Sequence, residues 1–600
     1  MSKEWLASSI AGHALLSDGR TSSLVFEDAT IDWLCLPRFD GEACFAALLG
    51  DGENGGWWLS PVGEITDRSR RYVDQSLILE TLFTTPDGEV AVIDFMPATT
   101  TRPTIVRIVE GRSGAVRLRS DLLPRFSYGR THPYVEFRSE KELFAYAGAD
   151  ALALRADCAI THDDRALTSE FEIRKGERVC FSLSWFPSTS GPPHAIDPQT
   201  VLDETQRQWA DWSAESDYTG YADDLVRRSL VVLKGLVCDE TGGIVAAATA
   251  SLPERPGGVR NWDYRFCWLR DAAFTLLAFL RTGHDDEARE WIEWLRRALA
   301  GEPITVQPFY GIGGNRHTVE WESDWLAGFG NARPVRFGNG ASGQLQLDIF
   351  GEVIDTLYLA RQHGIGGDDT RLVGDLARCL EDIWTQPDAG IWEGRGGPQQ
   401  HTYSNAMCWV AFDRAAKMLA GECRDDAQRW RDLAGEVHAR TLSKGFDEKV
   451  GAFTRVFEKS ELDASVLRLA LVGFIDAKDD RMVRTVAAIE RDLSEDGLLY
   501  RYASDAVDDG VGGEEGAFIA VNFWLVDVLA MQGRQKDAEA LFERIAGFAN
   551  DLGLLTEEIW VDDKRPIGNI PQALSHLALI NSALAIDAGG TPPRIEEISR

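Results

Sequence analysis

The sequence lacks any run of about 18 uncharged apolar residues, so no part of it predicts a transmembrane helix. Its first twenty residues, MSKEWLASSIAGHALLSDGR, lack the basic start and unbroken apolar core of a signal peptide. Its nine cysteines are scattered and form no CxxC pair, which disfavours a disulfide framework and a zinc site. Together these absences predict a protein of the reducing cytoplasm.

Basic residues are also scarce, since 62 Lys and Arg stand against 95 Asp and Glu, for a net charge of −33. Such a balance opposes binding to nucleic acid or to an anionic membrane, because phosphate contacts need a basic patch. No HExxH, GxxxxGK[ST] or strand-placed GxGxxG occurs, and the ten histidines form no ligand cluster. We therefore expect no metal and no cofactor; the oligomeric state, a homo-oligomer included, stays open.

The first third of the chain has an apolar pattern with a period of two. Short strands separated by Gly and Asp turns follow one another from about residue 20 to 190, among them 104–111 and 115–120 on either side of an SG turn. Many short strands of this kind indicate an antiparallel β-sandwich. A Pro-rich break at 190–198 ends the pattern.

From about residue 221 the apolar period becomes helical. Roughly twelve segments follow, 463–476 among them, and nearly all-apolar helices alternate with helices that carry a charged face. This alternation predicts the two concentric rings of an (α/α)6 barrel, although a helical repeat array gives a similar pattern. We thus expect a sandwich domain over 1–200, a helical linker over 201–220 and a barrel over 221–600.

Four long loops of the second half are rich in Gly, Trp and charged residues. Long loops are usually functional or disordered, and their aromatic residues argue against disorder. In a barrel, loops at one end of the inner helices form the site. The loops cover residues 239–268, 301–346, 387–402 and 551–570.

One of these loops places Glu393 directly after Trp392 and among glycines. An indole removes part of the hydration of a neighbouring carboxyl, which raises its pKa toward the value that a general acid needs. A solvated loop glutamate is the alternative.

The stretch GLLTEEIW places Glu557 and Glu558 side by side before the last helix. In extended backbone adjacent side chains point to opposite sides, so only one of the two can face a given site. Glu393 and Glu557 at the same barrel end would form the paired carboxylates of a glycosidase, about 6.5–9.5 Å apart if the enzyme inverts. A surface acidic pair is the alternative for Glu557 and Glu558.

Arg270 and Asp271 lie next to each other where an apolar helix begins, in the stretch GVRNWDYRFCWLRDAAFTL. An Arg fork beside a carboxylate can hold two neighbouring sugar hydroxyls, donating to one and accepting from the other. A structural ion pair at a helix N-terminus explains the same two residues equally well.

With these residues assembled, the chain resembles glycoside hydrolase family 15, the glucoamylase and trehalase family. The resemblance runs almost from end to end, and its motifs follow in family order. They are IDWLCLPRFDGEACFAALLG (31–50), GGVRNWDYRFCWLRDAAFTL (257–276), RPVRFGNGASGQLQLDIFGEVIDTLYL (333–359), GIWEGRGGP (390–398) with MCWVAFDRA (407–415), GEEGAF…FWLV (513–526) and EEIW…GNIPQALSHLALINSA (557–583).

This resemblance implies a β-sandwich followed by an (α/α)6 barrel, and exo-acting hydrolysis of α-glucosides with inversion to β-glucose. It assigns Glu393 as the general acid and Glu557 as the general base. The expected sugar-binding residues are Arg270 and Asp271 at the terminal glucose, Arg501 near the scissile bond, Trp268 and Trp392 as pocket walls, Glu558, and Arg38 and Asp40 from a sandwich loop.

Two segments depart from the family pattern. Residues 328–332 read GFGNA where Tyr-Arg-Gly-Ser is usual, and QQHTYSNAM (399–407) replaces a His-Phe-Thr-His-Ser-Lys type run. We expect both segments on the leaving-group side. The resemblance implies a small carbohydrate as the substrate and favours trehalase, with isomalto- or malto-oligosaccharide glucohydrolase as the alternative; an inverting phosphorylase and a non-catalytic sugar-binding protein are rivals of other classes.

Overall fold

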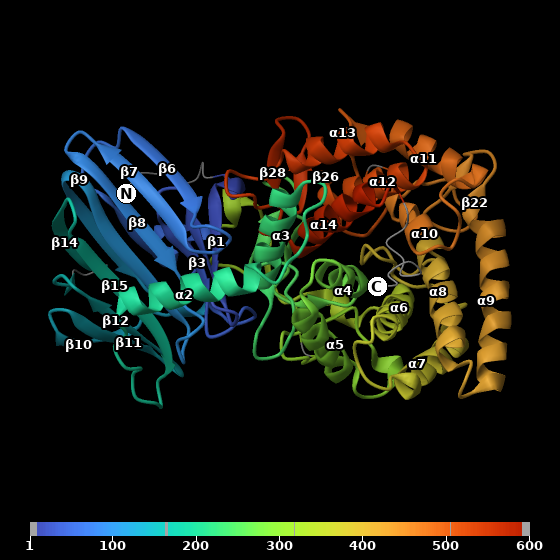
Figure 1. Ribbon diagram of the computed structural model, residues 1–600, viewed down its shortest axis with the longest axis horizontal. Coiled ribbons are helices and arrows are strands. Elements are labelled where there is room, and N and C mark those ends of the chain that lie inside the picture. Colours follow the sequence, from blue (N-terminus) through green and yellow to red (C-terminus); the bar gives the residue numbers. More distant parts are fainter. Residues whose placement is uncertain (1–8, 163–165, 317, 505, 591–600) are drawn as a thin grey trace.

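The computed structural model describes residues 9–590 apart from 163–165, 317 and 505, and shows a sheet-rich domain followed by a helical domain (Figure 1). The first eight residues, which entered the signal-peptide prediction, lie outside this part of the chain. None of the described helices combines the length and apolar character that a membrane crossing needs.

The N-terminal domain contains a 15-stranded antiparallel sheet that is organised around one long strand, β9. β9 pairs with β8 and β15 through its first half and with β5 and β14 through its second half. The prediction of two strands at 104–111 and 115–120 was therefore wrong, because one 20-residue strand runs through both. Gly111 permits this continuation: a Cβ there would lie 2.1 Å from the carbonyl oxygen of Arg174.

Apolar side chains from the two halves of this sheet meet in a common core. The rings of Trp57 on β5 and Phe181 on β15 contact edge to face with centroids 6.1 Å apart. The long strands of the domain are β1 (His13–Ser17), β2 (Ser22–Phe26), β3 (Ile31–Cys35), β5 (Gly56–Pro61), β6 (Asp67–Tyr72), β7 (Leu79–Thr85), β8 (Gly88–Phe95), β9 (Thr104–Leu123), β10 (Tyr134–Ser139), β11 (Glu142–Ala147), β12 (Asp150–Ala156), β14 (Leu167–Arg174) and β15 (Arg178–Pro187).

Helix α2 (Pro198–Ser213) runs from the sheet to the helical domain (Figure 1). The side chain of Asp197 caps its N-terminus by accepting from the backbone N–H of Thr200. The two domains also contact directly, since the indole N–H of Trp33 on β3 donates to the carbonyl of Ala248 at 2.9 Å. The sheet domain thus packs against the loop over residues 237–271, which leads into helix α4 (Ala272–Leu280).

The helices of the second domain are arranged as a closed inner ring with outer partners. α4, α6, α8, α10, α12 and α14 contact one another in this order, and α14 returns to α4. The helix predicted over 463–476 is shorter, a 3-10 turn at Ala464–Leu467 followed by α10 (Arg468–Leu471). The others are α3 (Asp223–Leu236), α4 (Ala272–Leu280), α5 (Asp285–Leu299), α6 (Asp348–Gln362), α7 (Thr370–Ile383), α8 (Thr402–Leu419), α9 (Arg424–Gly445), α11 (Asp480–Asp492), α12 (Ile519–Met531), α13 (Gln535–Ala546) and α14 (Ala573–Asp587).

A buried carboxyl on the inner helix α12 makes the stability of the fold pH-dependent. Asp527 accepts a 2.5 Å hydrogen bond from Ser582 of α14, and burial raises its pKa from 3.8 to about 8. The folded protein keeps this proton between these two values while the unfolded chain releases it, so the free energy of unfolding falls as the pH rises through this window.

We expect Asp527→Asn, which mimics the protonated acid, to stabilise the protein by about 2 kcal/mol or more at pH 8 and by much less at pH 5. Urea unfolding of both proteins at the two pH values measures this difference. An equal effect at both pH values would contradict the assignment of a raised pKa to Asp527.

Candidate active site

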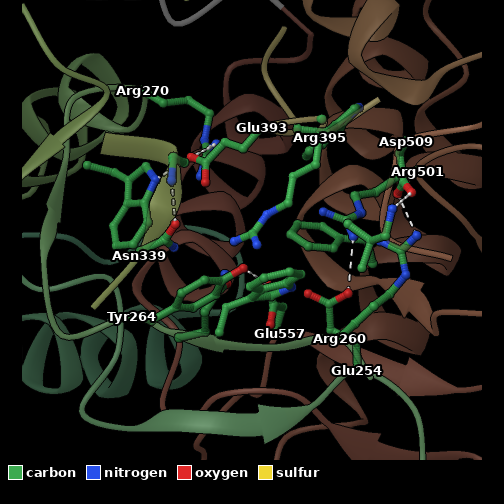
Figure 2. A pocket seen from close by; sticks show the side chains of 18 residues that line it. Glu254, Arg260, Tyr264, Arg270, Asn339, Glu393, Arg395, Arg501, Asp509 and Glu557 are labelled. Atoms are coloured by element: carbon green, nitrogen blue, oxygen red, sulfur yellow. Dashed lines mark hydrogen bonds and ion pairs between the residues drawn. The ribbon is translucent and has the colours of Figure 1, made fainter. Parts of the chain in front are cut away.

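A pocket in the helical domain is lined by loop residues from five separate parts of the chain (Figure 2). Its residues lie within the segments 254–270, 339–341, 392–395, 501–518 and 557–572. All four long loops singled out from the sequence contribute lining residues, the loop over 301–346 through Asn339 and Ala341, whereas the segment 501–518 lies outside those four loops. The pocket therefore gathers the segments in which the sequence predicted a site.

Glu393 lines this pocket with a backbone conformation that is unusual for a side-chain-bearing residue. Its φ is +58°, in the left-handed region, which costs free energy unless neighbouring groups hold it. The side-chain amide of Gln344 does so by donating to the carbonyls of Glu393 and Gly394, at 3.1 and 3.2 Å. Strain of this kind often accompanies function, because the surroundings must fix the residue in one position.

The carboxyl of Glu393 is held by two donors from a single segment. The indole N–H of Trp268 donates to Oε1 at 2.5 Å, and the Arg270 guanidinium lies 3.4 Å from the same oxygen. Burial raises the pKa of Glu393 above the ordinary value, and the positive charge of Arg270 opposes this only in part. The sequence predicted that the adjacent Trp392 indole raises this pKa by removing water. In the structure the Trp392 indole N–H donates to Asp463, and the indole that donates to the carboxyl is Trp268, whose hydrogen bond lowers the pKa of Glu393.

Glu557 lies on the opposite side of the pocket from Glu393 (Figure 2). Its Oε1 accepts a 2.5 Å hydrogen bond from the Tyr264 hydroxyl. Its Oε2 is buried and accepts no hydrogen bond of ordinary distance and angle within the described residues, although the backbone N–H of Asn569 is near enough to the carboxyl to lower its pKa. Burial raises the pKa of this carboxyl, while the Tyr264 hydroxyl and Arg501 lower it to a smaller extent.

Glu558 points away from the pocket, as the alternation of extended backbone requires. It begins strand β27 (Glu558–Trp560), is buried, and accepts from the backbone N–H of Gly516 at 2.7 Å. Glu557 lines the pocket and Glu558 does not. The geometry assigns the two neighbouring glutamates to different surroundings, so a direct contact between Glu558 and a ligand is not supported.

Arg270 and Asp271 form the pair that the sequence suggested, but only Arg270 lines the pocket. Its guanidinium donates to the carbonyl of Ile391 at 2.7 Å, and its Nε lies 3.5 Å from the carboxylate of Asp271. Asp271 precedes α4 as its N-cap residue. Both interpretations of the sequence therefore hold in part. Arg270 and Asp271 form an ion pair at the start of α4, and the guanidinium of Arg270 also lines the pocket.

Arg501 stands among three buried carboxylates at the back of the pocket. It donates to both oxygens of Glu515 at 3.1 and 2.7 Å and lies 3.4 Å from Glu254 and 3.8 Å from Glu558. Oxygen atoms of Glu254, Glu515 and Glu558 lie within 4.8 Å of one another, a grouping that could also hold a cation. In this structure the guanidinium of Arg501 supplies the positive charge beside these carboxyls. Its charge lowers the pKa of Glu254, but burial has the larger effect and raises it.

The remaining predicted residues divide into pocket walls and distant groups. Trp268 and Trp392 both line the pocket, and the Trp392 indole donates to Asp463 at 2.9 Å. Arg38 and Asp40 pair with each other at 3.0 Å outside the pocket lining, where Asp40 accepts from the backbone of Ile312.

The two segments that depart from the family pattern, 328–332 and 399–407, lie fully within the described chain, yet neither contributes a lining residue. The expectation that they line the leaving-group side is therefore not supported.

Sequence reasoning missed a set of polar and aromatic residues that also line the pocket. Most of them lie inside motifs quoted from the sequence, but no spacing rule separates them from ordinary loop residues. For Tyr264 alone a weak signal existed: it lies four residues before Trp268 in a non-helical segment, and extended backbone places residues an even number apart on the same face. The missed residues are Glu254, Arg260, Trp262, Tyr264, Asn339, Arg395, Asp509, Phe518 and Gln572.

Two buried carboxyls of raised pKa on opposite walls of one pocket can supply a proton and accept one in the same reaction. Comparison with known families agrees with this chemistry. The family described as glycosyl hydrolases family 15 matches residues 220–584, and a trehalase-like N-terminal domain matches residues 2–209. The chain belongs to glycosyl hydrolase family 15. It is accordingly a glycoside hydrolase.

Relatives of this family 15 member align over nearly its whole length. It is 38% identical to a trehalase of Mycobacterium tuberculosis, over 96% of this chain and 89% of that protein. It is 33% identical to a trehalase of Thermoplasma acidophilum, over 96% and 98% of the two chains. A bacterial glucoamylase complexed with acarbose shares its fold with a TM-score of 0.74 and 16% identity, over 98% and 95% of the chains.

The Arg501 cluster predicts a large stability effect. Arg501→Met would remove the guanidinium that contacts the three buried carboxylates of this cluster and leave only Arg260, 3.5 Å from Glu515, beside them. Removal of one partner from a buried ion pair costs about 3–5 kcal/mol. We expect a loss of this size in the free energy of unfolding at pH 8, measured by urea denaturation. The matched control is Arg174→Met, which breaks an exposed pair with Glu172 and should cost less than about 1 kcal/mol. Equal losses in the two variants would contradict the role given to Arg501.

Proposed function

We propose that this protein hydrolyses trehalose, an α,α-linked disaccharide of glucose, with inversion to release β-glucose. The observation that carries the proposal is that Glu393 and Glu557 line one pocket from opposite sides and each is held by a single aromatic donor. Full-length identity to proteins named trehalase supports the substrate.

Glu393 is the proposed general acid. Its Oε1 already accepts from Trp268 and faces Arg270, so the acidic proton resides on Oε2. Burial favours the protonated form, which a general acid needs at neutral pH. In the reaction this proton passes to the glycosidic oxygen as the bond from that oxygen to the anomeric carbon breaks, and the second sugar leaves as a neutral alcohol.

Glu557 is the proposed general base. Tyr264 occupies Oε1 and leaves Oε2 without a protein hydrogen bond in the described part of the chain, so Oε2 is the oxygen that can accept a proton from water. Gly568 gives this oxygen room, because a Cβ at that position would lie 2.9 Å from it. The activated water attacks the anomeric carbon on the face opposite Glu393, which inverts the configuration.

Charged side chains around this pair are proposed to hold the reacting glucose. Arg270 lies beside Glu393, so its guanidinium can donate to sugar hydroxyls next to the scissile bond. Asp271 pairs with Arg270, its carboxylate 3.5 Å from Nε. Arg501, fixed by Glu515, lies against the ring of Trp392 at 5.2 Å and can reach the sugar from the other wall.

The architecture that we propose for this enzyme has a β-sandwich over 1–200, a helical linker over 201–220 and an (α/α)6 barrel over 221–600. The core shared by the two sheet halves supports the sandwich. The closed ring of α4, α6, α8, α10, α12 and α14 supports the barrel. Nine free thiols support a reducing compartment, the cytoplasm.

A substrate panel tests the proposed function. Trehalose, kojibiose, nigerose, maltose, isomaltose and longer oligosaccharides are compared by kcat/KM, and NMR identifies the anomer of the first glucose released. We expect trehalose to be the best substrate and β-glucose to be the first anomer. A preference for maltose or isomaltose would favour the glucoamylase-like alternative, and α-glucose would contradict inversion. Glucose 1-phosphate formed only in phosphate would establish a phosphorylase.

Variants of the two carboxyls test their roles. We expect Glu393→Gln and Glu557→Gln each to lower kcat on trehalose by at least about two orders of magnitude, the low end for acid–base groups. Both variants should still bind trehalose, as measured by calorimetry, since Gln has the same size and shape as Glu and the other lining residues are unchanged. Glu558→Gln is the adjacent comparison outside the pocket lining and should lose far less. Wild-type turnover in either of the first two variants would refute the assignment of that residue.

The hydrogen bond from Tyr264 predicts a shift in the pH dependence of activity. This bond lowers the pKa of Glu557, so Tyr264→Phe raises it. Because the base acts in its ionised form, activity is lost as the pH falls through this pKa, and the acid limb of kcat/KM moves to higher pH by about one unit. Tyr500→Phe, which removes a hydroxyl paired with exposed Glu495, is the control and should leave the limb in place. A limb that stays or moves to lower pH would contradict the pairing.

A further inference from the structure

The loop that carries Glu393 turns a second charged residue into the same pocket, Arg395 (Figure 2). The backbone N–H of Arg395 donates to the carbonyl of Asp509 at 2.6 Å. Gly510 permits this contact, because a Cβ there would lie 2.3 Å from the backbone carbon of Arg395. The contact between these two loops fixes the backbone of Arg395 and therefore the direction in which its side chain points.

The guanidinium of Arg395 is oriented at its far end as well. It donates to both carboxylate oxygens of Glu320, at 2.9 and 2.5 Å, and lies 4.5 Å from the centre of the Trp262 ring. Glu320 is itself held by the backbone N–H of Gly340 at 2.9 Å. A bidentate ion pair against an aromatic ring holds the planar group in one orientation.

Among the arginines that line the pocket, Arg395 is the one most open to a ligand. The side chains of Arg260, Arg270 and Arg501 are 5%, 14% and 8% exposed and are committed to Asp509, Glu393 and Glu515. The side chain of Arg395 is 32% exposed. Its pairing with Glu320 uses two of the five N–H groups of a guanidinium, so others remain to meet a ligand.

The charge of this group selects the chemistry of the ligand. Glu320 neutralises Arg395, so the pair favours a neutral ligand with hydroxyl acceptors over an anion. The N–H groups that Glu320 does not use lie in the same fixed plane and can donate to hydroxyl oxygens of a pyranose ring. Arg395 also follows Glu393 by two residues in the same loop, and Glu393 is the proposed donor to the departing oxygen. Its side of the pocket is therefore the side of the leaving group.

We propose that Arg395, oriented by Glu320 and Trp262, binds hydroxyls of the leaving-group sugar and thereby makes the enzyme selective for a sugar over a small leaving group. This inference rests on the proposed hydrolysis of an α-glucoside. It assigns recognition of the two sugars to different arginines: Arg270 contacts the glucose that is attacked, and Arg395 contacts the sugar that departs.

Two substrates that share a glucosyl group but differ in leaving group test the proposal. Trehalose releases a sugar, whereas α-D-glucosyl fluoride releases fluoride, which has no hydroxyl for Arg395 to bind. We expect Arg395→Gln to lower kcat/KM for trehalose by about 10- to 100-fold, the cost of a lost charged hydrogen bond, and to change kcat/KM for the fluoride by less than about threefold.

The matched control is Arg336→Gln. Arg336 lies 4.6 Å from the same Trp262 ring and 3.8 Å from Glu320, but it does not line the pocket. Its substitution should change kcat/KM for both substrates by less than about threefold. A similar loss on trehalose alone in this variant would show that the ring and carboxylate, rather than Arg395, carry the selectivity, and would overturn the proposal.

Other outcomes are equally decisive. An equal loss on both substrates in Arg395→Gln, or no loss on either, would overturn the proposal. If Arg395→Gln does not fold, Arg395→Lys serves instead, since it keeps the charge without the planar fork; it should show the same selective loss. A wild-type enzyme that hydrolyses the fluoride but not trehalose would refute trehalose as substrate. The comparison is then made with its best α-glucoside, so the two proposals fail separately.

Discussion

Two hydrogen bonds from one short segment tie the candidate carboxyls to each other. Tyr264 donates to Glu557 and Trp268 donates to Glu393, and the two aromatic rings contact edge to face with centroids 5.3 Å apart. Glu393 and Glu557 come from loops 164 residues apart, so neither loop alone could fix their separation. The segment 264–268 holds both carboxyls, and the proposed reaction requires a fixed separation, because a water molecule and a sugar ring must fit between the two groups.

This segment is anchored in the sheet domain, which gives that domain a part in the site. Arg265 lies between the two aromatic donors and is buried, where it pairs with Asp263 at 2.6 Å. It also donates to the carbonyl of Gly41 at 2.6 Å and to the Tyr128 hydroxyl at 3.0 Å. Both of these partners belong to the sheet domain. Loops are mobile unless they are held, so the sheet supplies the rigid support on which the pocket segment rests.

Much of this arrangement could be predicted from local patterns, and the failures have physical reasons. The change from a period of two to a helical period gave the order of the domains, and the alternation of extended backbone separated Glu557 from Glu558. One strand was read as two, because the glycines near residue 111 look like a turn in a sequence, whereas in the sheet they permit a close backbone approach. Tyr264 and Arg395 escaped because their partners lie far away in sequence. A flexible arginine among glycines reads as solvated until Glu320 and Trp262 are placed beside it.

The charged groups of the pocket are divided between the proposed acid–base pair and Arg395, so the pair alone would not decide the substrate. Glu393, with its left-handed backbone, its Gln344 support and its Trp268 donor, is the group proposed to act on the bond that breaks, whatever sugar departs. Arg395 is fixed by different neighbours, Glu320 and Trp262, whose contacts do not involve either carboxyl. If Arg395 holds the leaving group as proposed, substitutions around Glu320 would change which leaving group is held while the contacts of Glu393 and Glu557 stay in place. A pocket built from two such independent parts allows related proteins to keep one reaction while differing in the second sugar.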